Sequence, residues 1–330
     1  MRIVVPAGGT GGARFVRGLL AALAEAGEPA DVTVVGNTGD DITLWGLRVC
    51  PDLDTVTYTL AGAIDEAKGW GRPDETFTVR DELAGYGVLP TWFGLGDRDL
   101  ATHLTRTSLL ASGATLSEAT ATIAARWGLP GLGVTLLPMS DSPVETHVLV
   151  QHPDDPAGAP PRLVHFQEYW VGLRAAPRAL DVVAVGAEQA RPAPGVLEAV
   201  AAADVVLLPP SNPVVSIGTV LAVPGVRAAL EASAAPVVGV APLVGGAVVR
   251  GMADRLLPAL GVEVDAGAVA LHYGASLLDG WLVDTSDVHA VAPVEQAGIA
   301  CRAVPLLMTD VPATARIAAE ALRLAEAVRA

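Results

Sequence analysis

The sequence predicts an α/β protein with a Rossmann-like, mostly parallel sheet, helices on both faces and a smaller helical insert. The chain begins with a strand-like run that leads through a glycine-rich turn into a helical pattern. Strand-like and helical segments then alternate, which favours a parallel sheet covered on both sides. The longest apolar stretch, residues 234–249, is interrupted by prolines and glycines, so it predicts a buried strand and a turn.

The first strand and its turn carry the clearest local signal. Residues 2–5 form a strand-like run, residues 15–26 follow with helical periodicity, and between them lie Gly8, Gly9, Thr10, Gly11 and Gly12. Glycines let the backbone approach an anion, and a helix N-terminus offers free N–H groups. We therefore expect a nucleotide or another phosphorylated ligand here. The alternative is a turn that only closes the strand–helix corner.

Neither common nucleotide fingerprint fits this turn. No Lys follows the glycines as in an ATPase P-loop, and Arg14 stands where a dinucleotide site would have its third glycine.

The later segments continue the alternation. Strands are predicted at residues 31–36, 133–137, 146–151, 203–208 and 235–240, and helices at 97–112, 115–127 and 313–330. The proline-rich stretch 151–161 is predicted to be a hairpin connection or a surface excursion. We assign residues 1–330 to a single domain, with a helical insert at about 60–130.

Composition limits the partners. A formal net charge of −15 argues against nucleic acid, because nucleic-acid binding depends on Lys and Arg that neutralise phosphates. No uninterrupted stretch reaches the roughly 20 apolar residues of a membrane span, and we expect no signal peptide before the first strand. Cys50 and Cys301 lie far apart, as expected of free thiols in a reducing compartment. We therefore expect a cytoplasmic protein without a membrane or nucleic-acid partner.

An acidic set follows the second strand. Asn37, Asp40 and Asp41 lie there, and Asp52 and Asp54 come soon after. Carboxylates beside a phosphate loop would repel the phosphate unless a cation lies between them, so Mg²⁺ or Ca²⁺ is the expected mediator. Turn formation and helix capping would explain the same residue types. We favour function for Asp41 and Asp54 and leave Asp40 and Asp52 open.

A polar helix face is the third feature. Asp99, His103 and Arg106 stand at i, i+4 and i+7, and Asp97 lies near the predicted helix start. This face could orient a polar substrate, or it could be an N-cap with a satisfied salt bridge. His103 has no second His or Cys at a ligand spacing, so zinc is not predicted.

Two further segments are candidates. Ser211 and Asn212 follow a buried strand, where they could bond a base, a ribose or a phosphate, although an Asx turn is the simpler explanation. The aromatic group around Trp170 could stack on a flat heterocycle, but core filling is favoured.

Taken together, these motifs resemble those of the 2-phospholactate transferase family, which acts in the synthesis of the deazaflavin hydride carrier coenzyme F-420. The resemblance runs in order from Arg2 to about Thr309. It rests on the segments 7–13, 37–41, 50–56, 95–103, 165–168 and 210–218. The His-Phe-Gln-Glu-Tyr-Trp version at 165–170 and the Ala-rich composition are most similar to the actinobacterial branch, which uses phosphoenolpyruvate.

The resemblance implies a transferase. Its donor would be a guanosine diphosphate carrying an enolpyruvyl or lactyl group, of which the branch favours enolpyruvyl. Its acceptor would be the deazaflavin Fo, whose ribityl hydroxyl attacks the distal phosphorus while GMP leaves. The product would be coenzyme F-420-0 or its dehydro form. The resemblance also suggests a homodimer.

The resemblance further implies roles for single residues. The turn Gly8–Gly12, Asn37, Ser211 and Asn212 would hold the donor. Asp54 would be catalytic, and with Asp41 it would bind Mg²⁺ or Ca²⁺. Gly94, Asp97 and His103 would contact substrate. In the lactyl branch a Lys commonly stands at the position of Gly94, so here a contact must come from the backbone or a neighbour.

Two other functions stay open. A nonenzymatic regulator similar to the gluconeogenesis-factor proteins would share the glycine loop and the Asn-Thr-x-Asp-Asp motif, but not the Pro-Asp-Leu-Asp-Thr motif at 51–55. A nicotinamide-dependent dehydrogenase would need a cleaner glycine fingerprint and would leave Asp97 and Ser211 unexplained.

Overall fold

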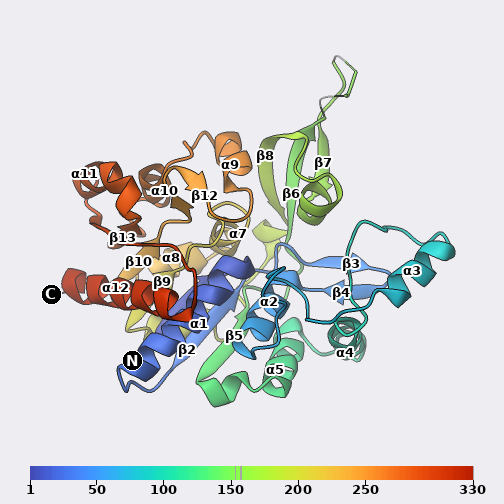
Figure 1. Cartoon of the computed structure of the whole chain (residues 1–330), viewed down its shortest axis with the longest axis horizontal. Coiled ribbons are helices and arrows are strands. Elements are labelled where there is room, and N and C mark those ends of the chain that lie inside the picture. Colours follow the sequence, from blue (N-terminus) through green and yellow to red (C-terminus); the bar gives the residue numbers. More distant parts are fainter. Residues whose placement is uncertain (153, 157, 330) are drawn as a thin grey trace.

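The computed structural model describes residues 1–152, 154–156 and 158–329, and its centre is a seven-stranded sheet (Figure 1). The strand order is β14-β13-β10-β9-β1-β2-β5, and every neighbouring pair is parallel. The strands are β1 (Ile3–Ala7), β2 (Val32–Gly36), β5 (Val134–Pro138), β9 (Val205–Leu208), β10 (Val237–Val240), β13 (Gly280–Val283) and β14 (Ala300–Ala303). The predicted Rossmann-like α/β class is confirmed.

Helices cover both faces of this sheet. On the face toward the viewer in Figure 1, α1 (Gly9–Glu25) lies beside α12 (Val311–Arg329) and packs on α2 (Pro51–Leu60). The other face carries α8 (Val226–Glu231), which packs on α6 (Val196–Ala202) and α7 (Ile217–Ala222). Farther along the sheet lie α10 (Ala266–Tyr273) and α11 (Val291–Gln296). All five residues of β1 are buried, as expected of a strand covered on both faces.

The strand order reverses at β1. From β1 the chain reaches β2 on one side, whereas β9 lies on the other side and leads on to β10. Ligands of open α/β sheets bind outside the carboxyl ends of the strands at such a switch point. The glycine turn follows β1 and the Ser211 segment follows β9, so the topology brings both to this position.

A second, antiparallel sheet has the order β7-β6-β8 and stands beside the main sheet (Figure 1). It contains β6 (Glu145–Gln151), β7 (Arg162–His165) and β8 (Arg178–Val185). The strands predicted at 133–137 and 146–151 therefore exist, but they belong to different sheets. The predicted connection 151–161 joins the antiparallel strands β6 and β7, and residues 153 and 157 within it lie outside the described residues.

The segment between α2 and β5 corresponds to the predicted helical insert. It contains α3 (Thr78–Gly85), α4 (Leu100–Ala111), α5 (Leu116–Arg126) and the 3-10 turn η1 (Leu129–Leu132). Thr115 and Glu118 form a capping box at the start of α5, which agrees with the predicted start at Thr115. The assignment of residues 1–330 to one domain stays a prediction.

Shorter elements complete the chain. They are the hairpin β3 (Ile42–Leu44) and β4 (Leu47–Val49), the hairpin β11 (Leu243–Val244) and β12 (Ala247–Val248), the helix α9 (Ala253–Leu256), the π-helical turn η2 (Glu168–Gly172), and the 3-10 turns η3 (Ala187–Gln189), η4 (Leu257–Leu260) and η5 (Thr285–Ala290). None of the helices in the described residues is both long enough and apolar enough to cross a membrane.

Candidate active site

The glycine turn packs closely against the segment that follows β9. Gly9 has a φ of 62°, in the region where glycine is favoured. A Cβ atom at Gly11 would lie 2.5 Å from the carbonyl oxygen of Pro210, and one at Gly12 would lie 2.7 Å from Oγ of Ser211. The glycines are therefore needed for packing as well as for any ligand.

Ser211 ties the two segments together. Its hydroxyl donates to the carbonyl oxygen of Gly8 at 2.8 Å, and its oxygen lies 3.4 Å from the Gly8 N–H. The side-chain oxygen of Asn212 accepts from the N–H groups of Val214 and Val215, at 2.9 and 3.2 Å. This is the Asx turn that was the simpler explanation for Asn212. Its ligand contact stays a prediction.

A buried pair of carboxylates lies beside the glycine turn. The amide nitrogen of Asn37 donates to Asp52 Oδ2 at 2.8 Å and to Asp40 Oδ1 at 3.2 Å, and Gln167 Nε2 donates to Asp40 Oδ2 at 3.1 Å. Asp52 Oδ2 would lie only 2.6 Å from a Cβ atom at Gly8. Both amides are neutral, so they supply hydrogen bonds without balancing the two charges.

The pKa values reflect this missing countercharge. Burial, followed by the charge of Asp52, raises the pKa of Asp40 well above its ordinary value. Burial raises the pKa of Asp52 to about 6, although hydrogen bonds from Asn37 and the backbone of Gly9 act against the shift. We call Asp40 and Asp52 the uncompensated pair.

Asp41 lies behind this pair and is fully buried. Its Oδ2 accepts from the Cys50 thiol at 2.9 Å and lies 3.5 Å from the Arg48 guanidinium, whereas its buried Oδ1 has no hydrogen-bond partner among the residues that the structure describes. Burial raises the pKa of Asp41 to about 7, and the charge of Arg48 opposes the shift.

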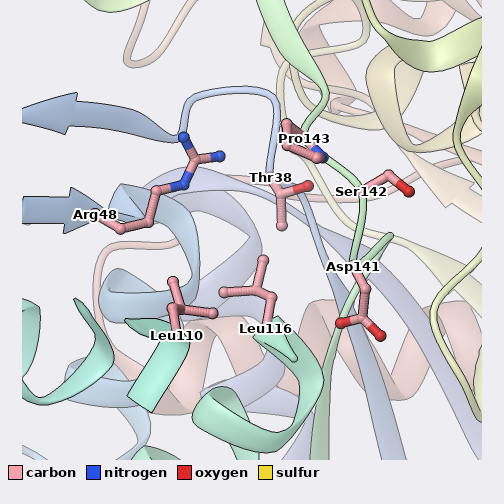
Figure 2. Close-up of a pocket in the computed structure, with 7 residues that line it drawn as sticks. All are labelled: Thr38, Arg48, Leu110, Leu116, Asp141, Ser142 and Pro143. Carbon is pink, nitrogen blue, oxygen red and sulfur yellow. The ribbon is translucent and has the colours of Figure 1, made fainter. Parts of the chain in front are cut away.

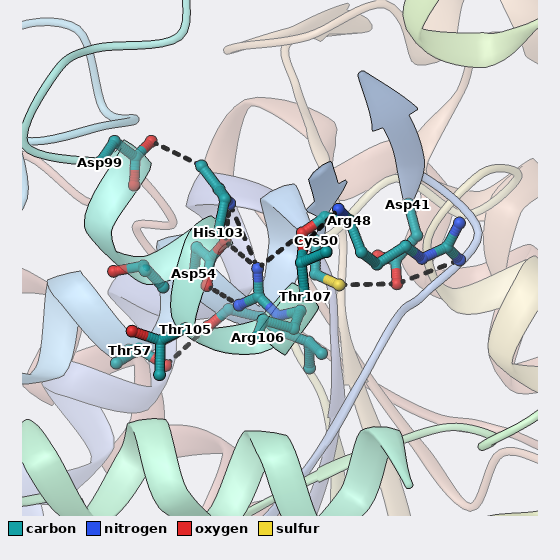
Figure 3. A network of polar contacts seen from close by, with 12 residues as sticks. Asp41, Arg48, Cys50, Asp54, Thr57, Asp99, His103, Thr105, Arg106 and Thr107 are labelled. Atoms are coloured by element: carbon teal, nitrogen blue, oxygen red, sulfur yellow. Dashed lines mark hydrogen bonds and ion pairs between the residues drawn. The ribbon is translucent and has the colours of Figure 1, made fainter. Parts of the chain in front are cut away.

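Asp54 has a different environment (Figure 3). The Arg106 guanidinium holds both of its oxygens: Nη1 donates to Oδ2 at 3.1 Å, and Nη2 donates to Oδ1. Nδ1 of His103 lies 3.2 Å from Nη1 of Arg106, and Nε2 of His103 lies 3.3 Å from Asp99. The side chains of His103 and Arg106 are each 1% exposed. His103, predicted to bind substrate, is therefore enclosed behind Arg106.

The remaining predicted substrate contacts lie in the insert. Asp97 accepts from the Thr76 hydroxyl at 2.6 Å and from the N–H groups of Thr78 and Val79, so it caps α3, whereas α4 begins only at Leu100. The hydrogen bond from Thr76 and those from the backbone lower the pKa of Asp97 to about 2. Gly94 lies against Trp70, whose Cη2 atom would be 3.4 Å from a Cβ atom there.

A cavity of about 260 Å³ opens next to Arg48, on the side of α4 and α5 (Figure 2). It is lined by Thr38, Arg48, Leu110, Leu116, Asp141, Ser142 and Pro143. The residues predicted to bind substrate or metal are not among these, so this cavity neighbours the candidate site without including it.

The carboxylates can accommodate a hard cation. Mg²⁺ in proteins is commonly held by one or two carboxylates together with phosphate oxygens of the substrate. The uncompensated pair supplies two carboxylates of this kind, whereas Asp54 already faces Arg106. Within the described residues, no group of three or more His, Cys, Asp or Glu side chains is arranged around a metal position.

Sequence reasoning missed three partners of these carboxylates. Gln167 reaches Asp40 from a segment 127 residues away, Arg48 reaches Asp41 from β4, and Tyr58 donates to Asp99 at 2.6 Å. Tyr58 stands at i+4 from Asp54 on α2, but its partner Asp99 is 41 residues away, so spacing in the sequence did not predict this contact. The aromatic group at 166–170 is divided, since Phe166 and Tyr169 are buried and Trp170 is 40% exposed.

Known proteins similar to this chain identify its family. The family model described as 2-phospho-L-lactate transferase CofD matches residues 3–303. A protein of Kitasatospora aureofaciens named phosphoenolpyruvate transferase is 64% identical, with 100% of this chain and 99% of that protein covered. One of the same name from Mycolicibacterium smegmatis is 48% identical, covering 98% of this chain and 99% of that protein.

Solved structures support the fold. A crystal structure of a Bacillus halodurans protein superposes with a TM-score of 0.63 at 17% identity, covering 97% of this chain and 99% of that one. A second crystal structure, described as a member of the UPF0052 family from the same organism, superposes with a TM-score of 0.61 at 16% identity. It covers 97% of this chain and 98% of that one. At such low identity the likeness concerns the fold alone. The match over residues 3–303 and the close relatives decide the family: the chain belongs to the 2-phospho-L-lactate transferase CofD family.

Proposed function

We propose that this protein transfers a phosphoenolpyruvyl group from a guanosine diphosphate donor to the ribityl hydroxyl of the deazaflavin Fo, with release of GMP. Family membership makes it a transferase of coenzyme F-420 biosynthesis. The choice of enolpyruvyl over lactyl rests on the name of the relatives that are 48–64% identical. The product of this reaction would be dehydro coenzyme F-420-0.

The observation that carries the proposal is the contrast between two sets of carboxylates at one sheet edge. The glycine turn, Asn37 and the Ser211–Asn212 segment would hold the donor diphosphate beside the uncompensated pair. Asp54, whose orientation Arg106 fixes, would receive the acceptor hydroxyl. Phosphoryl transfer needs mainly positioning and charge neutralisation, and these residues can supply both.

The reaction exchanges one bond for another at the distal phosphorus. The hydroxyl oxygen of Fo forms a bond to this phosphorus and loses its proton to water, and the bond to the bridging oxygen of GMP breaks, so the electron pair leaves with GMP. Asp54 would orient the attacking hydroxyl by accepting its hydrogen bond. Gly94 and Asp97 would border the acceptor, with Gly94 offering backbone only.

A divalent cation, Mg²⁺ or Ca²⁺, belongs to the proposal. The sequence assigned it to Asp41 and Asp54. Because Arg106 occupies Asp54, we propose that Asp40 and Asp52 hold the cation together with phosphate oxygens of the donor, and that Asp54 serves the acceptor. When bound, the cation neutralises the charge of the donor phosphates. A cytoplasmic location, expected from the composition, and a homodimer, suggested by the family resemblance, are further parts of this proposal.

The test is a mass-spectrometric turnover assay with Fo, Mg²⁺ and equal amounts of the lactyl and enolpyruvyl guanosine donors. We expect an Fo phosphodiester whose mass corresponds to the enolpyruvyl product, and we expect it to disappear when the metal is chelated. A product of lactyl mass would correct the donor. No product with either donor, together with retained binding of a nucleotide diphosphate, would favour the nonenzymatic regulator.

A further inference from the structure

Arg106 stands directly behind the carboxylate to which the proposed function assigns the acceptor. It lies on α4, and besides Asp54 its Nη1 contacts the carbonyl oxygen of Arg48 at 3.3 Å. Although burial acts to lower the pKa of Arg106, the charge of Asp54 raises it above its ordinary value. The guanidinium is therefore a fixed positive charge. Its planar fork matches a carboxylate with two parallel hydrogen bonds, which fixes direction as well as distance.

His103 continues the contact away from the site (Figure 3). A guanidinium only donates, so Nδ1 of His103, 3.2 Å from Arg106 Nη1, must act as the acceptor. The ring proton then lies on Nε2 and faces Asp99 at 3.3 Å. Asp99 also receives the Tyr58 hydroxyl at 2.6 Å. The result is a chain of side chains from Asp54 through Arg106 and His103 to Asp99 and Tyr58.

In this series of side chains, Asp54 is the one that would contact the substrate. The side chains of Arg106 and His103 are 1% exposed, whereas Asp54 keeps 6%. An ionised carboxylate has about four lone-pair positions, and the fork of Arg106 takes two of them. The other two remain available to the hydroxyl group of the acceptor.

Stability alone is a weak explanation for this arrangement. Replacing a buried ion pair with well-packed apolar residues is often neutral or stabilising, because removing two charges from water is costly. Orientation of the Asp54 carboxylate is the stronger explanation, since a displacement of a reacting group by about 1 Å can lower turnover about 100-fold.

We infer that Arg106 is a positioning residue: it fixes the rotamer of Asp54 for the acceptor hydroxyl, and His103 in turn orients Arg106. This inference rests on the proposed function for the role of Asp54. It assigns His103 a place behind the site, where it acts through Arg106 and does not contact the substrate.

The experiment compares Arg106→Lys with wild type by steady-state kinetics and by crystal structures. Lys keeps the charge but lacks the fork. We expect kcat to fall about 100-fold, KM for the guanosine donor to change less than twofold, and the Asp54 carboxylate to turn away from its wild-type rotamer. His103→Gln acts one contact farther away, so we expect about a tenfold fall in kcat.

Arg227→Lys is the matched control, because Arg227 pairs with Glu231 at 2.8 Å within α8, away from the site. Its kcat should stay within twofold of wild type. A kcat of Arg106→Lys within threefold of wild type, or an unchanged Asp54 rotamer, would overturn the inference. Absence of product from wild type would defeat the proposed function instead, and the two crystal structures would still decide whether Arg106 positions Asp54.

Discussion

Two groups of carboxylates lie near the same edge of the main sheet, and their electrostatic environments are opposite. Within the described part of the chain, the side-chain donors to Asp40 and Asp52 are neutral amides, and the pKa values of both residues are raised. Asp54 has the guanidinium of Arg106 on both oxygens. Asp99 has His103 and Tyr58, and although burial acts to raise its pKa, their hydrogen bonds lower it.

The difference indicates which carboxylates are suited to bind a ligand. A buried charge without a partner is costly, so the uncompensated pair is where, in our proposal, a cation that accompanies a phosphorylated donor supplies the countercharge. Asp54 and Asp99, which we call the compensated group, need no such partner and keep a fixed geometry. One group therefore suits binding, and the other suits orientation.

The strongest way to break this comparison is Asp54→Asn. We expect kcat to fall at least about 1,000-fold, equivalent to about 4 kcal/mol, because an amide offers only one acceptor oxygen. The protein should still fold, with the free energy of unfolding reduced by about 3 kcal/mol, since Arg106 loses its countercharge. Turnover in the Fo assay and urea unfolding measure the two effects. Turnover close to wild type would remove Asp54 from the mechanism.

The uncompensated pair predicts a gain in stability. Asp52→Asn should raise the free energy of unfolding of the metal-free protein by up to about 3 kcal/mol at pH 7.5, because it removes a buried charge whose pKa is about 6 in the folded state and about 4 when unfolded. The folded state binds more protons between these values, so wild type loses stability as pH rises from about 4 to about 6. Urea unfolding in chelator across this range measures the gain, which should vanish below about pH 4.

Mg²⁺ provides the control for this prediction. At 100 times its dissociation constant, the cation should stabilise wild type by about 2.7 kcal/mol and should leave Asp52→Asn nearly unchanged. Equal stabilisation of both proteins would place the cation elsewhere.

The fold was accessible from the sequence because its signals are local. Strand and helix periodicities and the glycine turn lie within short windows, and they predicted the parallel sheet and the edge where the motifs meet. The division between the carboxylates was not accessible. It depends on Arg106, which is 52 residues from Asp54, and on Gln167, which is 127 residues from Asp40. In the sequence, Asp41 and Asp54 belong to the same acidic set, and both were predicted to bind a metal. In the structure, their partners give them different environments.

For the compensated group we predict the opposite change in stability, and Asp99 provides the test. Asp99→Asn should lower the free energy of unfolding by about 2 kcal/mol at pH 7, because the charged acceptor of His103 and Tyr58 is lost. The pKa of Asp99 is lowered in the folded state, so its contribution is present above the unfolded value of about 4 and is lost as pH falls further. The deficit should therefore shrink in acid. A deficit that does not depend on pH would indicate lost packing in place of lost charge.

Tyr58→Phe tests the far end of the chain with the least disturbance. The ring lies edge-on to Trp127, with centroids 5.3 Å apart, and Phe retains this contact, so the variant isolates the hydroxyl. We expect about 1–2 kcal/mol less stability, from the lost hydrogen bond to Asp99, and a fall in kcat of no more than about threefold. Urea unfolding and the Fo assay provide both numbers. Although Tyr58 lies one helical turn from Asp54 on α2, its hydroxyl contacts Asp99 and Thr102, so its effect on kcat should be the smallest of the series. A fall in kcat above tenfold would mean that Tyr58 acts at the site directly, and the separation between a ligand-binding pair and an orienting chain would then be lost.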